Sequence, residues 1–359
     1  MKYGKSLNEM IRELDARHKN REDYIADPKA MSFAVDPETK ETRLGLIVNV
    51  DGEERQIVSS LKDLAHSQLL ERLDIPASFD RKVLQLHPEL HQVNVNYLLQ
   101  NHAKNPLMVR TLNGASDAIL SNAYKRMDNW PVAEKVIPVL HEAGVKVESC
   151  EVTDHKMYIK VVSERLQGDV KVGDPVQMGI IVSNSEVGLG FLNVQTLLYR
   201  LICDNGMITG KDFGSGIRYA HRGSRQPLGI VYSEDTMQAH GHAIGLQVRD
   251  TIKQILAPEN FEKHLVALRE TTERRVTGDP TKAVEMLGKT VGFTQDEGTS
   301  IMRHLIEGGD LSQYGLAQAV TRFAQDEIVT YDRSTELERI GGRIIELTPR
   351  QTKLVLEAA

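Results

Sequence analysis

The stretch SNSEVGLGFLNVQTLLYRLICDNGMI, residues 183–208, connects two apolar segments through a pair of glycines. The apolar run MGIIV precedes it at 178–182, and Gly188 and Gly190 stand before apolar residues at helical spacing over 192–202. This order predicts a strand, a glycine turn and a helix. Because nucleotide-binding proteins hold phosphate at such a turn, the stretch is either a cofactor-binding loop or a connection inside a packed core.

The glycines lack the surroundings that a nucleotide site requires. A dinucleotide fingerprint needs a third glycine and an acidic residue at the end of the next strand, but Phe-Leu-Asn follows Gly190 and Asp204 is not so placed. The Gly-Lys-Ser/Thr of a phosphate-binding loop is also missing. Glycine readily adopts the positive φ of a tight turn. We therefore interpret the glycines as a strand-to-helix connection and expect no cofactor.

Turn signals and hydrophobic spacing divide the chain into four parts. The dipeptides Asp51-Gly52 and Asn113-Gly114 lie between β-prone runs and predict hairpins, and GGRIIELT at 341–348 is predicted to be one more strand. The predicted parts are an N-terminal helix and hairpin (1–58), a helical segment (59–105), a strand-rich core (106–234) and a helical C-terminal region (235–359). The expected fold is α+β: an antiparallel sheet core with a long packed helix, preceded by an α/β N-terminal region and followed by a helical region.

Composition and charge exclude several classes of protein. The chain has 359 residues, of which 40% are hydrophobic, and a formal net charge of −6. These values exclude a globally basic nucleic-acid binder but not a local basic patch. We find no signal peptide and no apolar run of about 18 residues. Cys150 and Cys203 are far apart and outside any Cys-x-x-Cys, which favours two buried thiols in a cytoplasmic protein without membrane association.

A basic, glycine-rich segment directly follows the opening stretch. The sequence GKDFGSGIRYAHRGSR at 210–225 carries several cations and a single acidic residue, Asp212. Guanidinium groups can grip phosphate through two hydrogen bonds, and a tyrosine can stack on an unpaired base. The predicted nucleic-acid-binding residues are Lys211, Arg218, Tyr219, Arg222 and Arg225, with Lys125, Arg126 and Arg200 extending the track. Alternatively these are scattered surface charges, since acids roughly balance them and other cations, such as Lys156, over 101–230.

Residues 59–345 resemble a family of phage- and plasmid-associated proteins that is grouped as a domain of unknown function. The stretches that carry the resemblance are LKDLAHSQLLERLDIPASF (61–79), MVRTL (108–112), AILSNAYKRMDNWPV (118–132), the opening stretch, LSQYGLAQAVTRFAQD (311–326) and ELERIGGRIIEL (336–347). The opening stretch is the most diagnostic of them. The resemblance implies an origin in mobile elements and implies no particular activity.

The order of elements is similar to a second group. Antiparallel strands followed by a long helix and a basic, glycine-rich segment resemble the core of the ring-forming single-strand annealing proteins. This resemblance implies a homo-oligomer that holds single-stranded DNA in a basic groove. No motif matches residue by residue, so no site residue is transferred. We therefore expect a cytoplasmic protein that binds single-stranded nucleic acid in DNA annealing or recombination.

Two other functions stay open at this point. His240 and His242, separated by one glycine, could present two imidazoles to a metal ion in a metal-dependent hydrolase. Spacing reveals no third ligand, so we assign no metal site, and the absence of Gly-x-Ser-x-Gly leaves no catalytic nucleophile to assign. The other function is a structural or protein-interaction role in a phage assembly, with the C-terminal helices as the docking surface.

Overall fold

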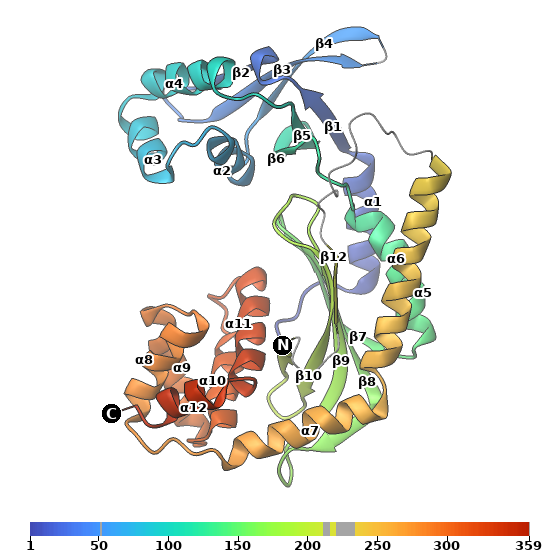
Figure 1. Ribbon diagram of the computed structural model, residues 1–359, viewed down its shortest axis with the longest axis vertical. Coiled ribbons are helices and arrows are strands. Elements are labelled where there is room, and N and C mark those ends of the chain that lie inside the picture. The colour runs from blue at the N-terminus through green and yellow to red at the C-terminus, as the bar shows by residue number, and fades with distance from the viewer. Residues whose placement is uncertain (51, 211–215, 220–233, 359) are drawn as a thin grey trace.

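The structure is a computed structural model that describes residues 1–50, 52–210, 216–219 and 234–358, and the backbone alone over 234–241. Its elements form an open, C-shaped molecule (Figure 1). An α/β layer lies at one end, a central sheet forms the back, and the C-terminal helices lie at the other end. The predicted fold class, α+β with antiparallel strands and a helical C-terminal region, is confirmed.

The N-terminal layer joins two small antiparallel sheets, of order β2-β3-β4 and β1-β5-β6, to three helices. Its elements are β1 (Arg21–Ala26), η1 (Pro28–Ala30), β2 (Met31–Val35), β3 (Thr42–Val50), β4 (Glu53–Ser60), α2 (Asp63–Arg72), α3 (Ala77–Leu86), α4 (Pro88–Asn101), β5 (Leu107–Leu112) and β6 (Ala115–Ser121). Strand β3 alternates buried and exposed residues, and its buried Leu44 and Leu46 pack with Leu69 of α2 and Val95 of α4. Strands β3 and β4, and likewise β5 and β6, pair across the predicted hairpin dipeptides.

The central sheet has the antiparallel order β11-β10-β9-β8-β7, and β12 pairs with the first half of β10, along the edge whose second half pairs with β11. Its strands are β7 (Lys146–Val152), β8 (Met157–Asp169), β9 (Pro175–Asn184), β10 (Leu192–Arg200), β11 (Asn205–Ile208) and β12 (Gly216–Tyr219). Helices α1 (Leu7–Lys19), α5 (Asn129–Glu142) and α6 (Glu234–Ile255) cover one face of this sheet (Figure 1). The opposite face looks toward the opening of the C.

The opening stretch forms the hairpin β9–β10, so the helix predicted over 192–202 is wrong. Val194 and Leu198 belong to the large core on the helix-covered face, whereas Leu197 and Tyr199 pack on the opposite face. A strand that is buried on both faces has few polar positions, and its apolar residues then fit helical spacing too. The glycine turn connects two strands, and Gly188 supplies a left-handed residue at φ +83°.

The C-terminal region consists of helices α7 (Pro258–Glu273), α8 (Pro280–Val291), α9 (Gln295–Gly308), α10 (Gln313–Phe323), α11 (Tyr331–Ile345) and α12 (Pro349–Leu356). The strand predicted at 341–348 is wrong, because this segment begins inside α11. Gly341 and Gly342 allow α11 to pack tightly, since a Cβ on Gly342 would collide with the Ile208 carbonyl of β11. None of the described helices combines the length and apolar character needed to cross a membrane.

A buried ion pair fixes α11 to the open face of the central sheet. Lys160 Nζ of β8 lies 2.6 Å from Glu338 Oε2, and both side chains are fully buried. The Tyr331 ring lies 4.8 Å from the same ammonium group and closes the pair from one side. Since Arg339 follows Glu338 on α11, this attachment also holds Arg339 against the sheet.

Candidate nucleic-acid interface

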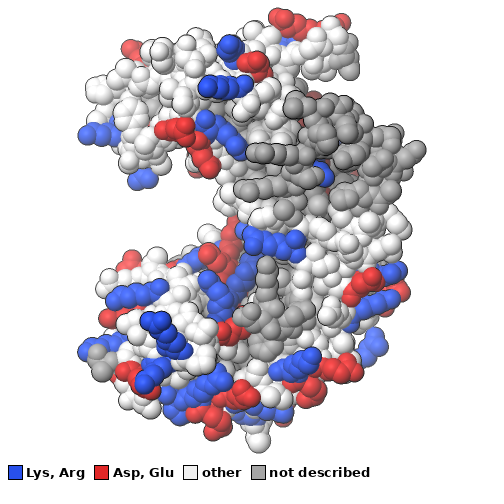
Figure 2. Space-filling model, in the orientation of Figure 1, with Lys and Arg blue, Asp and Glu red and all other residues white. Residues whose placement is uncertain are grey.

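The open face of the molecule is hollowed between the N-terminal layer and the C-terminal helices. Figure 2 shows this hollow, with lysine and arginine side chains gathered on the wall that the sheet and the C-terminal helices form. Acidic side chains lie among them. The question is therefore which of these cations are neutralised by a carboxylate and which are available to a ligand.

A cavity of about 550 Å³ lies where the β9–β10 turn, the β10–β12 pair and α11 meet. Its charged lining residues are Lys156, Arg218 and Arg339, and no Asp or Glu occurs in the described lining. The remaining polar and aromatic lining side chains are Ser183, Asn193, Gln195 and Phe191. The cavity thus presents positive charge together with neutral hydrogen-bonding groups.

Lys156 and Arg339 create the positive charge at the inner side of the cavity. Burial lowers the pKa of Lys156 and the positive charge of Arg339 lowers it further, against the opposing charges of Asp332 and Glu336. Burial also lowers the pKa of Arg339. Two cations that burial deprives of solvent favour an anion between them, because the anion stabilises both charged forms.

Arg339 is held in place by neutral groups of the sheet. Its Nε donates to Gln195 Oε1 at 3.1 Å, and its Nη2 donates to Ser183 Oγ at 3.3 Å. No carboxylate of the described chain forms an ion pair with Arg339 or Lys156. The guanidinium is therefore positioned without being neutralised. The glycine at 190 leaves room for Lys156, since a Cβ there would lie 3.3 Å from Lys156 Cε.

Arg218 forms the outer side of the cavity. It lies on β12 opposite Asn193 of β10, and its guanidinium carbon is 3.8 Å from the centre of the Phe191 ring. The side chain is exposed and has no ion-pair partner in the described part of the chain. A stacked guanidinium keeps its hydrogen-bond donors at its edge, where a phosphate can reach them.

The other predicted residue of β12, Tyr219, lies apart from this cavity. Successive side chains of a strand point to opposite faces, and the Tyr219 ring packs against the large core under the helices. Burial raises the pKa of its hydroxyl. Lys211, Arg222 and Arg225 lie outside the described residues.

Arg200 is at the far end of β10 from Arg218. Arg200 lies seven positions along the strand from Asn193, the partner of Arg218, which corresponds to about 23 Å. Asp174 neutralises Arg200 through two contacts, at 2.5 Å from Nε and 3.0 Å from Nη2. The structure therefore does not bring Arg200 and Arg218 together.

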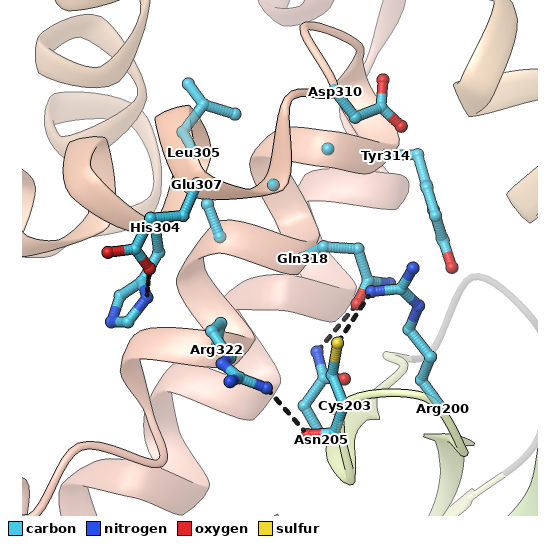
Figure 3. A pocket seen from close by; sticks show the side chains of 13 residues that line it. Arg200, Cys203, Asn205, His304, Leu305, Glu307, Asp310, Tyr314, Gln318 and Arg322 are labelled. Carbon is cyan, nitrogen blue, oxygen red and sulfur yellow. Dashed lines mark hydrogen bonds and ion pairs between the residues drawn. The ribbon is translucent and has the colours of Figure 1, made fainter. Parts of the chain in front are cut away.

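Arg200 lines a different, smaller pocket of about 220 Å³ between the β10–β11 turn and helices α9 and α10 (Figure 3). Arg200 and Arg322 both reach Cys203 there: Arg200 Nη1 lies 3.5 Å from its Sγ, and Arg322 Nη1 lies 3.4 Å from its carbonyl oxygen. His304 and Glu307 form the opposite side. Unlike the larger cavity, this pocket contains carboxylates.

The remaining predicted cations lie between β6 and α5. Arg126 is exposed and forms an ion pair of 3.2 Å with Asp23, and Lys125 beside it is half-buried. Neither lines the cavity. For the metal hypothesis, His242 is exposed on α6, and the side chain of His240 lies outside the described residues.

Sequence reasoning found Arg218 but did not select Lys156 or Arg339 as site residues. Lys156 is one of many cations in the middle of the chain, and the residues next to it in the sequence do not distinguish it from the others. Arg339 lies in ELERIGGRIIEL, where paired glycines in a helical pattern indicate close packing. That pattern was the available signal for Arg339.

Comparison with known proteins places the chain in a family. The model of the family described as "Domain of unknown function (DUF932)" matches residues 118–327, from β6 to just past the end of α10, and so includes Lys156 and Arg218. No curated protein and no solved structure matches the chain. Because the match spans more than half of its length, the chain belongs to the DUF932 family of uncharacterised domains.

Proposed function

We propose that the protein binds single-stranded nucleic acid in the hollow on its open face. The observation that carries this proposal is the set of cations around one cavity, Lys156, Arg218 and Arg339, without a carboxylate partner among the described residues. Such cations are held ready for phosphate, because folding has not already neutralised them. Lys211, Arg222 and Arg225, which are near Arg218 in sequence, would extend the same contact.

A single strand fits this site better than a duplex. The cavity has the size of a small-ligand site, so it suits one phosphate with its sugar and base. The exposed Arg218 guanidinium already stacks on the Phe191 ring, and a splayed base can stack on the outer face of this guanidinium. Bases in a duplex are stacked on one another and do not present such a face.

The biological setting of this binding is also part of the proposal. The resemblance to phage- and plasmid-associated proteins and to annealing proteins supports a role in DNA annealing or recombination on mobile elements. Under this proposal the protein acts in the cytoplasm as a homo-oligomer, which would join several hollows into a longer track for DNA.

A salt titration tests the proposal. We expect a fluorescent oligo-dT to bind with an affinity that falls with salt at a log–log slope of about −2, or about −0.7 for each of the three phosphate contacts. The variants Lys156→Ala and Arg218→Ala should each make this slope shallower by about 0.7. Arg303→Ala is the matched control, because Arg303 is an exposed cation of α9 that lines neither of the two cavities described above.

Two outcomes would contradict the proposal. One is the absence of oligonucleotide binding at low salt. The other is binding whose salt slope changes no more in the cavity variants than in Arg303→Ala, which would place the nucleic acid elsewhere on the surface.

A further inference from the structure

A cluster of possible metal ligands lies in the N-terminal layer, outside the residues that match the family model. His66 of α2, Asp80 of α3 and His91 of α4 each direct one ligand atom to a common point, and these atoms all lie within 4.8 Å of one another. Asp80 Oδ1 is 3.0 Å from His66 Nε2 and 2.6 Å from His91 Nε2. Three helices thus converge through their polar side chains.

We infer that this cluster binds a divalent transition-metal ion, with Zn²⁺ as its representative. A tetrahedral zinc ion holds nitrogen and oxygen ligands at about 2.0–2.1 Å and therefore about 3.3 Å from one another. The two distances from Asp80 to the histidines, 3.0 and 2.6 Å, are slightly shorter than this value, and all three ligand atoms lie within 4.8 Å of one another, so small shifts of the side chains admit the ion. Two imidazoles and one carboxylate are also a donor set that zinc and iron(II) use when they keep a coordination position open.

The surroundings orient the ligands as a metal site requires. Thr42 Oγ1 lies 3.3 Å from His66 Nδ1, so it fixes the ring with Nε2 toward the centre. Phe33 packs against both rings, with centroids 5.8 Å from His66 and 5.4 Å from His91. His91 is buried, and its Nδ1 has no hydrogen-bond partner in the described chain. Packing and the contact at Nε2 therefore hold this ring.

The cluster is open on one side. The side chains of His66 and Asp80 are 13% and 15% exposed, whereas that of His91 is 1% exposed. An ion bound there would be held on its buried side by His91 and would face solvent on the side of His66 and Asp80. A water molecule or an oxygen of a substrate can therefore complete its coordination.

Helix α3 gives the proposed ion a structural consequence. No residue of α3 is buried, so apolar packing holds this helix only weakly. Asp80 is its polar link to both α2 and α4. A metal ion that replaces this hydrogen-bonded contact with three coordinate bonds would fix α3 in place.

Zinc binding by the full-length chain tests the inference. We expect chelator-stripped protein that is reloaded with Zn²⁺ to retain one ion per chain after dialysis, and Co²⁺ to give the visible absorption of a tetrahedral site. Thr42→Val removes a group that orients a ligand, so it should weaken zinc binding by roughly 10–100-fold. His66→Gln and Asp80→Asn remove a ligand itself, so each should weaken zinc binding by more than this. Zinc should slow amide hydrogen exchange over 77–86 in the wild type and in the control variant His102→Ala, but not in His66→Gln or Asp80→Asn.

His102→Ala is the matched control. His102 Nε2 also lies 3.0 Å from a carboxylate oxygen, that of Asp74, in the same layer but at an exposed position, and this change leaves all three proposed ligands in place. Circular dichroism verifies that each variant is folded. Wild-type protein that retains no stoichiometric zinc would overturn the inference, and so would folded ligand variants that bind zinc with wild-type affinity. Neither result bears on nucleic-acid binding at the cavity.

Discussion

Lys156, Arg218 and Arg339 differ from two other arginines of the central region in the charges that surround them. Arg110 is fully buried and is neutralised by Asp23 and Asp128, and Asp174 neutralises Arg200. The three cavity cations face a shared space without such partners in the described chain. The availability of a cation to a ligand therefore depends on its partners, and sequence charge alone does not reveal them.

The Lys160–Glu338 pair provides a residue-scale prediction about stability. Lys160→Met leaves the buried Glu338 carboxylate without its partner, and we expect a loss of about 3–5 kcal/mol in the free energy of unfolding. The double variant Lys160→Met/Glu338→Leu should recover most of this loss, because no charge is then buried alone. Urea denaturation followed by circular dichroism measures both.

The control for this prediction is Lys19→Met. Lys19 pairs with Asp15 at the surface of α1, with side chains 69% and 39% exposed, so its removal should change the free energy of unfolding by no more than about 0.5 kcal/mol. A Lys160→Met variant as stable as Lys19→Met would show that the buried pair does not hold α11 on the sheet.

At the scale of elements, sequence patterns identified most of the helices and hairpins but failed where both faces of an element are buried. The hairpins at the Asx-Gly dipeptides follow from local turn chemistry. Strand β10 is covered on both faces, so its pattern did not distinguish a strand from a helix. The end of α11 looked like a strand because β-branched residues follow its glycines, and those glycines are explained only by the tertiary contact with Ile208.

The site could be predicted only in part for the same reason. Arg218 lies in a segment whose local composition is unusual, so the sequence singles it out. Lys156, Arg339 and the cluster of His66, Asp80 and His91 are assembled from separate elements. Their proximity is a product of packing and leaves no local signature in the chain.

The close packing of α11 gives a prediction at this scale. Gly342→Ala places a methyl group against the Ile208 carbonyl of β11, so the helix must move, and we expect a loss of about 1–3 kcal/mol in stability. Gly308→Ala, in α9, is the control: no atom lies within 4 Å of the added Cβ, and stability should rise by about 0.5–1 kcal/mol. Thermal unfolding of both variants compares the two. Equal effects would contradict the close contact between α11 and β11.

At the scale of the whole molecule, the N-terminal layer, the central sheet and the C-terminal helices surround one hollow (Figures 1 and 2). The cavity is made jointly by the sheet and α11, so it exists only when these parts are assembled. The family model covers the central sheet and helices α5 to α10 but not α11. The chain therefore completes its candidate site with an arginine from beyond the matched region.

The most direct test of nucleic-acid binding is to locate the strand on the protein. We expect an oligo-dT that carries photoreactive thymidines to crosslink, on irradiation, to peptides that contain Phe191 or Arg218, because these side chains form the stacking side of the cavity. Mass spectrometry identifies the crosslinked peptides, and Arg218→Ala should reduce their yield while Arg303→Ala does not. Crosslinks confined to peptides outside the cavity, or yields that Arg218→Ala leaves unchanged, would contradict the account.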